Sequence, residues 1–234
     1  RGAALDLAES CLKLGMSCPL FVTDPGLVKI GLVSPILEKL NSANLAPIIF
    51  DQVMEDPPEN IVREGFESGY QGNVDGVIGF GGGSSMDVAK VVAVLLGGDQ
   101  TLPELYGVDQ VTNLRLPLIL IPTTAGTGSE STPVAVVTTG ETTKAGISSC
   151  ALLPDVAVLD PNLTLGLPPN ITAMTGVDAM VHAIEAYTSK HKKNPMSDGL
   201  SVHALKLLSQ NIRTAVSDGG NIESREGMLL GSML

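Results

Sequence analysis

Residues 76–87 read Gly-Val-Ile-Gly-Phe-Gly-Gly-Gly-Ser-Ser-Met-Asp, and this stretch decides the fold. Its apolar beginning predicts a strand over 76–80, and the residues after the glycines predict a helix over 85–96. The glycines between them let a ligand approach the backbone closely, and the first turn of a helix offers free N–H groups to a phosphate. A strand, a glycine-rich turn and a helix in this order therefore indicate an α/β protein with a phosphate-binding turn.

This turn differs from the Rossmann fingerprint. A Gly-x-Gly-x-x-Gly pattern that starts at Gly79 would need glycine at position 84, where the chain has Ser84. The turn also follows a later strand of the chain and not the first one. Ser84 and Asp87 fit a helix N-cap box as well, a structural interpretation that is compatible with phosphate binding. We therefore predict a phosphate-binding turn of another kind.

Apolar, β-branched runs alternate with amphipathic stretches along the first two thirds of the chain. We predict strands over 20–23, 47–50, 76–80, 116–121, 134–138 and 156–159. We predict helices over 3–14, 27–40, 60–71 and 85–96. Continuously apolar strands separated by helices indicate a parallel sheet that is covered on both faces.

The pattern changes near Leu167, where the strand signals stop. Helices are predicted there over 171–187 with Asn170 as N-cap, from Pro195 to 216 with Asn194 as N-cap, and from 222 onward. Pro168-Pro169 is a plausible boundary. We therefore predict an α/β dinucleotide-binding domain over 1–166, followed over 167–234 by the start of an all-helical metal and substrate domain.

A second polar loop, residues 121–130, follows the next predicted strand and reads Ile-Pro-Thr-Thr-Ala-Gly-Thr-Gly-Ser-Glu. Its threonines and glycines supply hydroxyl and amide donors without bulk. A single loop of this kind is usually only a turn. Because open α/β sheets bind ligands at the carboxyl ends of their strands, two such loops on successive strand ends indicate a nucleotide cleft.

Asp178 and His182 lie four residues apart in the predicted helix over 171–187. Both side chains therefore project from one face, where one divalent cation can take an oxygen and a nitrogen donor together. The neighbouring residues are small or apolar, so we expect the pair to point into the protein interior. The alternative is a hydrogen bond between the two side chains across one helical turn.

Asp24 and Lys144 have two interpretations each. Asp24 ends an early predicted strand, where a carboxylate can accept the ribose hydroxyls of adenosine and repel a 2′-phosphate. Asp24-Pro25-Gly26 is also a good turn sequence. Lys144 lies in a polar, hairpin-like stretch and is either a solvated charge or a phosphate or ribose contact.

The composition excludes several classes of partner. The chain is 44% hydrophobic and 17% charged, which is typical of a globular protein, and its net charge is −11. That acidity argues against nucleic acid and against an anionic membrane surface. Three cysteines without a Cys-x-x-Cys pair indicate reduced thiols and a cytoplasmic location. The chain opens at Arg1 and closes at Leu234 without helix stop signals, so we expect it to be truncated at both ends.

Together these motifs resemble the iron-containing (group III) alcohol dehydrogenase family. The matching residues are Gly81-Gly82-Gly83-Ser84 with Asp87, then 122–130, then Leu167-Pro168-Pro169, then Thr175-Gly176-Val177-Asp178-Ala179 with His182, Glu185 and Tyr187. The resemblance implies a dehydroquinate synthase-like parallel sheet whose opening strand, ahead of Ala3, is missing here. It implies a metal held by Asp178 and His182 and by two histidines beyond this chain. Around NAD it places Asp24, Gly82, Gly83, Ser84, Asp87, Thr123, Thr124, Thr127 and Lys144.

The implied activity is hydride transfer between a small alcohol and NAD, with an aldehyde or ketone as the product. The divalent metal is expected to be Fe²⁺, with Zn²⁺ as the alternative, because mixed oxygen and nitrogen ligation suits both. We expect a homo-oligomer, a dimer or larger. Three alternatives stay open: a hydroxyacid–oxoacid transhydrogenase of the same family, a dehydroquinate synthase-type lyase, and an inactive fragment that binds NAD.

Overall fold

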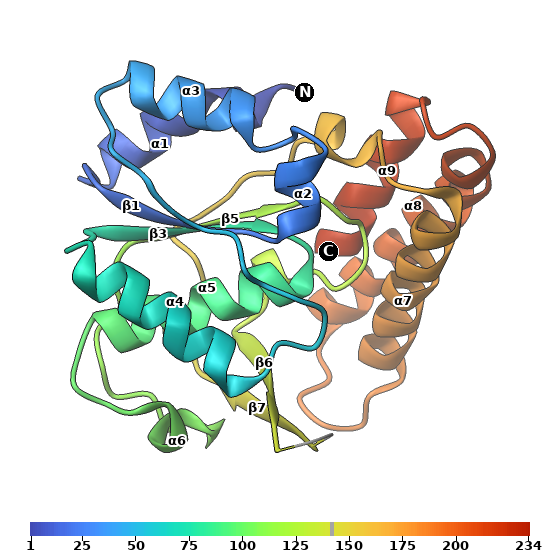
Figure 1. Ribbon diagram of the computed structural model, residues 1–234. Coiled ribbons are helices and arrows are strands. Elements are labelled where there is room, and N and C mark those ends of the chain that lie inside the picture. The colour runs from blue at the N-terminus through green and yellow to red at the C-terminus, as the bar shows by residue number, and fades with distance from the viewer. Residues whose placement is uncertain (141–142) are drawn as a thin grey trace.

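A parallel sheet of five strands forms the centre of the molecule (Figure 1). The computed structural model describes residues 1–140 and 143–234. The strand order is β2-β1-β3-β5-β8, and every pair is parallel. The strands are β1 (Pro19–Val22), β2 (Ile48–Phe50), β3 (Gly76–Gly81), β5 (Leu118–Pro122) and β8 (Val156–Ala157). The predicted α/β class with a parallel sheet is confirmed.

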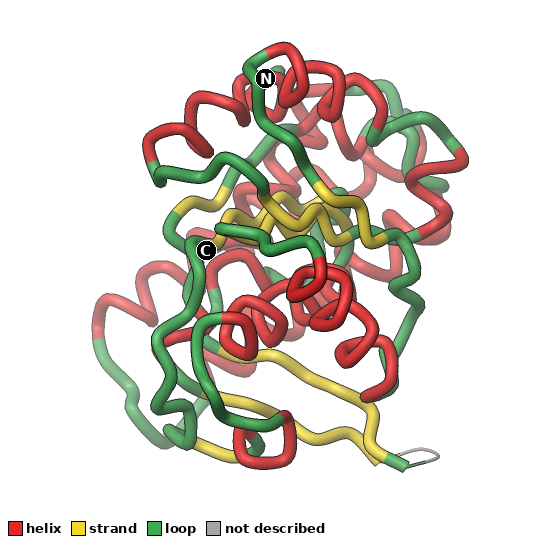
Figure 2. The backbone as a smooth tube through the Cα atoms, turned by 60° about the vertical axis from the view of Figure 1, so that its left-hand side comes forward, coloured by secondary structure: helices red, strands yellow, loops and turns green. Residues whose placement is uncertain are grey.

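Helices cover both faces of this sheet (Figure 2). Alternate strand residues point to opposite sides, so Phe21 and Ile78 belong to one core and Leu20 and Val77 to the other. Burying each such side chain contributes about 1.5–3 kcal/mol. The first core contains residues of α1 (Leu7–Lys13) and α3 (Ser34–Ser42), and the second contains residues of α4 (Glu59–Gln71) and α5 (Gly83–Leu96).

The predicted strand over 134–138 exists but does not join the parallel sheet. As β6 (Val134–Thr139) it pairs in antiparallel fashion with β7 (Thr143–Ser148), and β4 (Gly107–Val108) completes a separate sheet of three strands. The stretch between β5 and β6 contains only a short 3-10 turn, η2 (Ser129–Ser131), and a parallel partner would need a longer crossover. The short helix α6 (Leu102–Leu105) precedes β4.

Three helices follow the sheet: α7 (Pro169–Thr188), α8 (Pro195–Ser217) and α9 (Ile222–Met233). Asn194 caps α8 as predicted, since its side chain accepts from Ser197 N at 3.0 Å. Gly176 packs against α8 and α9, since a Cβ there would lie 2.9 Å from Ile212 Cδ1 and 2.7 Å from Met228 Cε. Among the described residues, none of the helices combines the length and the apolar character needed to cross a bilayer.

Several predicted element boundaries were wrong. The predicted helix over 27–40 is two helices, α2 (Pro25–Lys29) and α3, because Gly31 takes a left-handed φ of 77° between them. The predicted helix over 3–14 begins as the 3-10 turn η1 (Ala3–Asp6). Asn170 does not cap α7, since Pro169 already occupies the first turn and no side chain caps this end. The division at residue 166 stays a prediction.

Candidate active site

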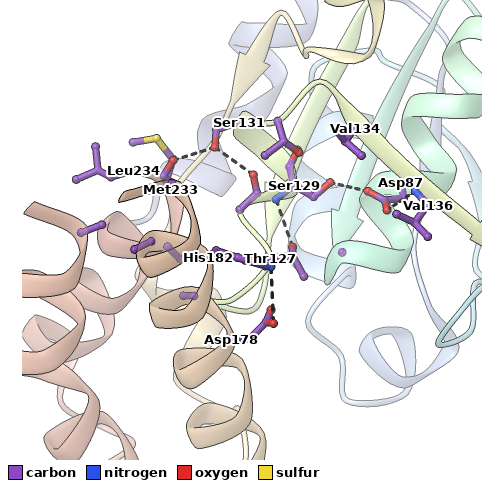
Figure 3. Close-up of a pocket in the computed structure, with 18 of the residues that line it drawn as sticks. Asp87, Thr127, Ser129, Ser131, Val134, Val136, Asp178, His182, Met233 and Leu234 are labelled. Atoms are coloured by element: carbon purple, nitrogen blue, oxygen red, sulfur yellow. Dashed lines mark hydrogen bonds and ion pairs between the residues drawn. The ribbon is translucent and has the colours of Figure 1, made fainter. Parts of the chain in front are cut away.

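One cleft of about 930 Å³ lies between the sheet and the three C-terminal helices. Its walls come from the N-terminus of α5, the loop after β5, the β6–β7 hairpin, and helices α7 to α9. Figure 3 shows Asp178 and His182 on α7 at one side of this cleft and Asp87 and Ser129 at the other. Residues far apart in the sequence thus surround one space.

The N-terminus of α5 forms part of this wall. The helix begins at Gly83, Gly82 is its N-cap, and no side chain caps it. The predicted capping box of Ser84 with Asp87 was wrong, because the Asp87 carboxylate is used elsewhere: Oδ1 accepts from Ser129 Oγ at 2.7 Å and Oδ2 accepts from Val136 N at 2.9 Å. Among the residues that the structure describes, no side chain caps the first turn of α5, so its N–H groups can bind an anion.

The glycine turn and the loop after β5 contact each other. Thr123 N donates to Gly81 O at 2.9 Å, and a Cβ on Gly83 would lie 2.8 Å from Thr127 Cγ2. A Cβ on Gly82 would meet nothing closer than Thr124, at 3.7 Å, so space is open above this residue. Such an open approach to the backbone beside uncapped N–H groups fits a phosphate.

The predicted cofactor residues divide into two groups. Gly83, Ser84, Asp87, Thr127 and Lys144 line the cleft. The remaining predicted residues, Gly82, Thr123, Thr124 and Asp24, are not among its lining residues. The roles of both groups toward a cofactor stay predictions.

Asp24 lies at the end of β1, next to β3 in the sheet. Its Oδ1 accepts from Leu27 N at 3.0 Å and so caps α2. Asp24 therefore has the local structural role that its Asp-Pro-Gly turn sequence predicts. A capping carboxylate keeps further lone pairs, so ribose binding stays compatible with this geometry.

Lys144 is held at the edge of the cleft by a residue that sequence reasoning missed. Its Nζ lies 2.5 Å from Asp56 Oδ1. Asp56 lies in the loop between β2 and α4, and this loop also accepts two hydrogen bonds from Thr138. Thr138 Oγ1 donates to Asp56 O at 3.0 Å, and Thr138 N donates to Pro57 O at 2.9 Å. The hairpin is thereby fastened to the loop before α4. No local pattern predicts a pair separated by 88 positions.

Asp178 and His182 lie on the cleft side of α7. Their Oδ1 and Nε2 atoms are 3.8 Å apart, and about half of each side chain is exposed (48% and 51%). The expectation that they point into the interior was wrong, because the surrounding apolar side chains Val177 and Val181 are exposed as well. In residues 1–140 and 143–234 no third His, Cys, Asp or Glu joins them to form a metal-binding group. The pair fits two positions of a metal's coordination shell.

A buried charge cluster, which the sequence did not predict, lies behind the cleft wall formed by residues 129–136. Lys90 is fully buried, and burial lowers its pKa to about 8 against the charges of Asp87 and Glu130. Burial raises the pKa of Asp87 and that of Glu130. Lys90 lies among apolar residues of α5, where the sequence pattern predicts core, and only the folded structure shows its partners.

Comparison with known families assigns both parts of the chain. The model of the family described as iron-containing alcohol dehydrogenase matches residues 1–161. The model described as the C-terminal part of the Fe-containing alcohol dehydrogenase family matches residues 172–234.

Curated proteins and solved structures agree with these matches. The long-chain-alcohol dehydrogenase 1 of Geobacillus thermodenitrificans is 42% identical over 100% of this chain and 59% of its own length. The sulfoacetaldehyde reductase of Bilophila wadsworthia is 38% identical over 100% of this chain and 60% of its own length. The chain thus spans 59–60% of the length of these relatives.

Two solved structures share the fold along nearly the whole chain. A 1,3-propanediol oxidoreductase has a TM-score of 0.94 and 37% identity, over 98% of this chain and 60% of its own. The sulfoacetaldehyde reductase of Bifidobacterium kashiwanohense, solved in complex with NAD+, has a TM-score of 0.92 and 33% identity, over 100% of this chain and 62% of its own.

Proposed function

The chain belongs to the iron-containing alcohol dehydrogenase family, as its motifs indicated, and from this we propose that it serves hydride transfer between a small alcohol and NAD. The product is an aldehyde or a ketone. One observation supports this proposal most strongly: a single cleft joins the uncapped N-terminus of α5 to the Asp178–His182 pair on α7. An uncapped helix end suits the pyrophosphate of NAD, and a pair of metal-ligand side chains suits metal-assisted oxidation of an alcohol.

The cofactor half of the cleft consists of protein groups that bind and orient. The N–H groups of Gly83 and Ser84 would bind the pyrophosphate, and Thr127 and Lys144, which line the same cleft, would contact the cofactor. Asp24, which follows β1 and lies outside the cleft lining, would set the preference for NAD over NADP through its charge. The NAD+ complex of the sulfoacetaldehyde reductase, at 33% identity, supports this choice of cofactor.

The metal half consists of Asp178 and His182. An Fe²⁺ or Zn²⁺ ion would act as a Lewis acid and favour loss of the proton from the alcohol hydroxyl. The carboxylate and the imidazole would hold that ion one turn apart on α7, and two more protein ligands would complete a closed site. Both side chains are open to the cleft, as such a role requires.

A second candidate function is NAD binding without metal chemistry. Its support is that residues 1–140 and 143–234 contain no group of three or more His, Cys, Asp or Glu side chains that could hold a metal ion. The lyase alternative has less support, because the matching family models and relatives are dehydrogenases and reductases. The relatives differ in substrate, so the alcohol itself and the transhydrogenase alternative remain predictions. The homodimer and the cytoplasmic location remain predictions as well.

An activity screen tests the proposal. The intact gene product, loaded in turn with Fe²⁺ and Zn²⁺, is assayed for NADH formation with short alcohols, diols and hydroxy acids. We expect metal-dependent NADH formation with at least one alcohol. NAD binding with no NADH formation for every combination of metal and substrate would favour the second candidate function.

A further inference from the structure

The ammonium group of Lys90 is buried behind the cleft wall formed by residues 129–136. Lys90 lies on α5, seven residues or about two turns after Gly83, and has no exposed surface. Its Nζ donates to Ser129 Oγ at 2.8 Å, to Thr132 O at 2.9 Å and to Val134 O at 2.8 Å. An ammonium group has three N–H bonds, so these three acceptors satisfy it completely.

Asp87, one turn earlier on the same helix, completes this cluster. Its Oδ1 accepts from Ser129 Oγ at 2.7 Å and lies 4.0 Å from Lys90 Nζ, and its Oδ2 accepts from Val136 N at 2.9 Å. The Ser129 hydroxyl therefore accepts from Lys90 and donates to Asp87. Two charged side chains of α5 thus hold the whole segment from Ser129 to Val136.

This segment is a wall of the cleft. Ser129, Thr132, Val134 and Val136 all line it, whereas Lys90 does not. Removing a charge from water is unfavourable, and well-packed apolar residues often replace buried charges without loss of stability. A role in stability alone therefore accounts poorly for Lys90, whereas a role in fixing the wall accounts for all three of its hydrogen bonds.

We propose that Lys90 is a positioning residue for the cofactor: through Ser129, Thr132 and Val134 it fixes the cleft wall relative to the anion-binding N-terminus of α5. Lys90 contacts no ligand itself. The inference rests on the proposed binding of NAD in this cleft.

The charge of Lys90 gives the proposal a pH signature. Burial lowers its pKa to about 8, and the charged groups that face it are Asp87 on α5 and Glu130 on η2. Loss of the proton leaves two N–H bonds for three acceptors and removes a positive charge near the anion site. NAD affinity should therefore fall as the pH rises through about 8.

Stability should change in the opposite direction. The ordinary pKa of this lysine is 10.5, so above about pH 8 the folded chain has released a proton that the unfolded chain still holds. The contribution of Lys90 to the free energy of unfolding therefore increases with pH up to about 10.5. A merely structural lysine would show this stability change without any change in NAD affinity.

The test compares NAD affinity at about pH 7 and about pH 9.5. NAD is titrated into the intact wild-type protein and into the variants Lys90→Met and Lys90→Arg. The control variant is Lys39→Met, which alters an exposed lysine of α3. Thermal unfolding checks that each variant is folded. We expect folded Lys90→Met to bind NAD at least about tenfold more weakly at pH 7. We expect Lys90→Arg, which keeps its charge, to lose the pH dependence, and Lys39→Met to match wild type.

Each outcome decides a different point. If the wild type does not bind NAD, the proposed function fails and this inference fails with it. If wild type binds NAD and folded Lys90→Met binds it equally well, only this inference fails. If neither Lys90 variant folds, the wild-type pH profile decides: weaker binding above about pH 8 supports the role, and a flat profile overturns it.

Discussion

A single carboxylate, Asp24, both caps α2 and carries the expected choice of cofactor. Asp24→Asn keeps a good N-cap but removes the charge, so it isolates the electrostatic effect. Relief of the clash with a 2′-phosphate is worth on the order of 1 to 3 kcal/mol. We expect NADP binding to improve and NAD binding to change little, as measured by dissociation constants for both cofactors. A wild type that binds both equally would show that Asp24 does not face the ribose.

A second substitution of a single residue, Gly82→Val, tests whether the glycine turn binds phosphate. The backbone there has an ordinary φ of −78°, and a Cβ would have 3.7 Å of clearance to Thr124, so Gly82→Val should fold. The branched side chain would occupy the open approach to the first turn of α5, and we expect NAD affinity to fall more than about tenfold. Gly166→Val is the control, because Gly166 is exposed, has open space and lies outside the cleft lining. Unchanged NAD affinity in folded Gly82→Val would remove the phosphate role.

Between elements, Arg225 holds α9 against the beginning of α7. This buried side chain donates to Thr172 Oγ1 at 2.7 Å, to Leu167 O at 3.1 Å and to Gly219 O at 3.1 Å. Lysine cannot reproduce the planar fork, so Arg225→Lys should lower the free energy of unfolding by about 1 to 3 kcal/mol. Urea unfolding measures this, with the exposed Arg213→Lys on α8 as control. Equal losses in both variants would contradict the assignment.

Local patterns and long-range pairs differ in how far the sequence predicts them. The strands of the parallel sheet and the glycine turn were predictable, because apolar runs and glycines act over a few residues. The break at Gly31 and the antiparallel pairing of β6 depend on backbone geometry and on the length of the connection. The Lys90–Ser129 and Lys144–Asp56 contacts arise only when folding brings separate elements together.

A local sequence pattern also does not predict whether a helix face is exposed. The small and apolar neighbours of Asp178 indicated an interior, yet periodicity shows only which residues share a face of α7 and not what covers it. The structure leaves Asp178, His182, Val177 and Val181 exposed. The residue types at the site were therefore predictable, and their surroundings were not.

For the molecule as a whole, two ligands are too few to retain a metal tightly. We expect the 234-residue chain to lose Fe²⁺ or Zn²⁺ on dialysis. In the intact gene product, any retained metal should be lost by His182→Ala and kept by His203→Ala, since His203 is exposed on α8 outside the cleft. Metal analysis after dialysis measures this. Tight stoichiometric metal in the 234-residue chain would show that a further group completes the site.

The most direct test of the joined cleft is a crossed comparison of His182→Ala and Gly82→Val in the metal-loaded, intact protein. NAD affinity, bound metal and alcohol-dependent NADH formation are measured for both variants and for wild type. We predict that His182→Ala binds NAD but loses metal and turnover, and that Gly82→Val keeps metal but loses NAD and turnover. Wild-type turnover in folded His182→Ala would contradict the assignment of this cleft as the active site, and unchanged NAD affinity in folded Gly82→Val would contradict the phosphate role of the glycine turn.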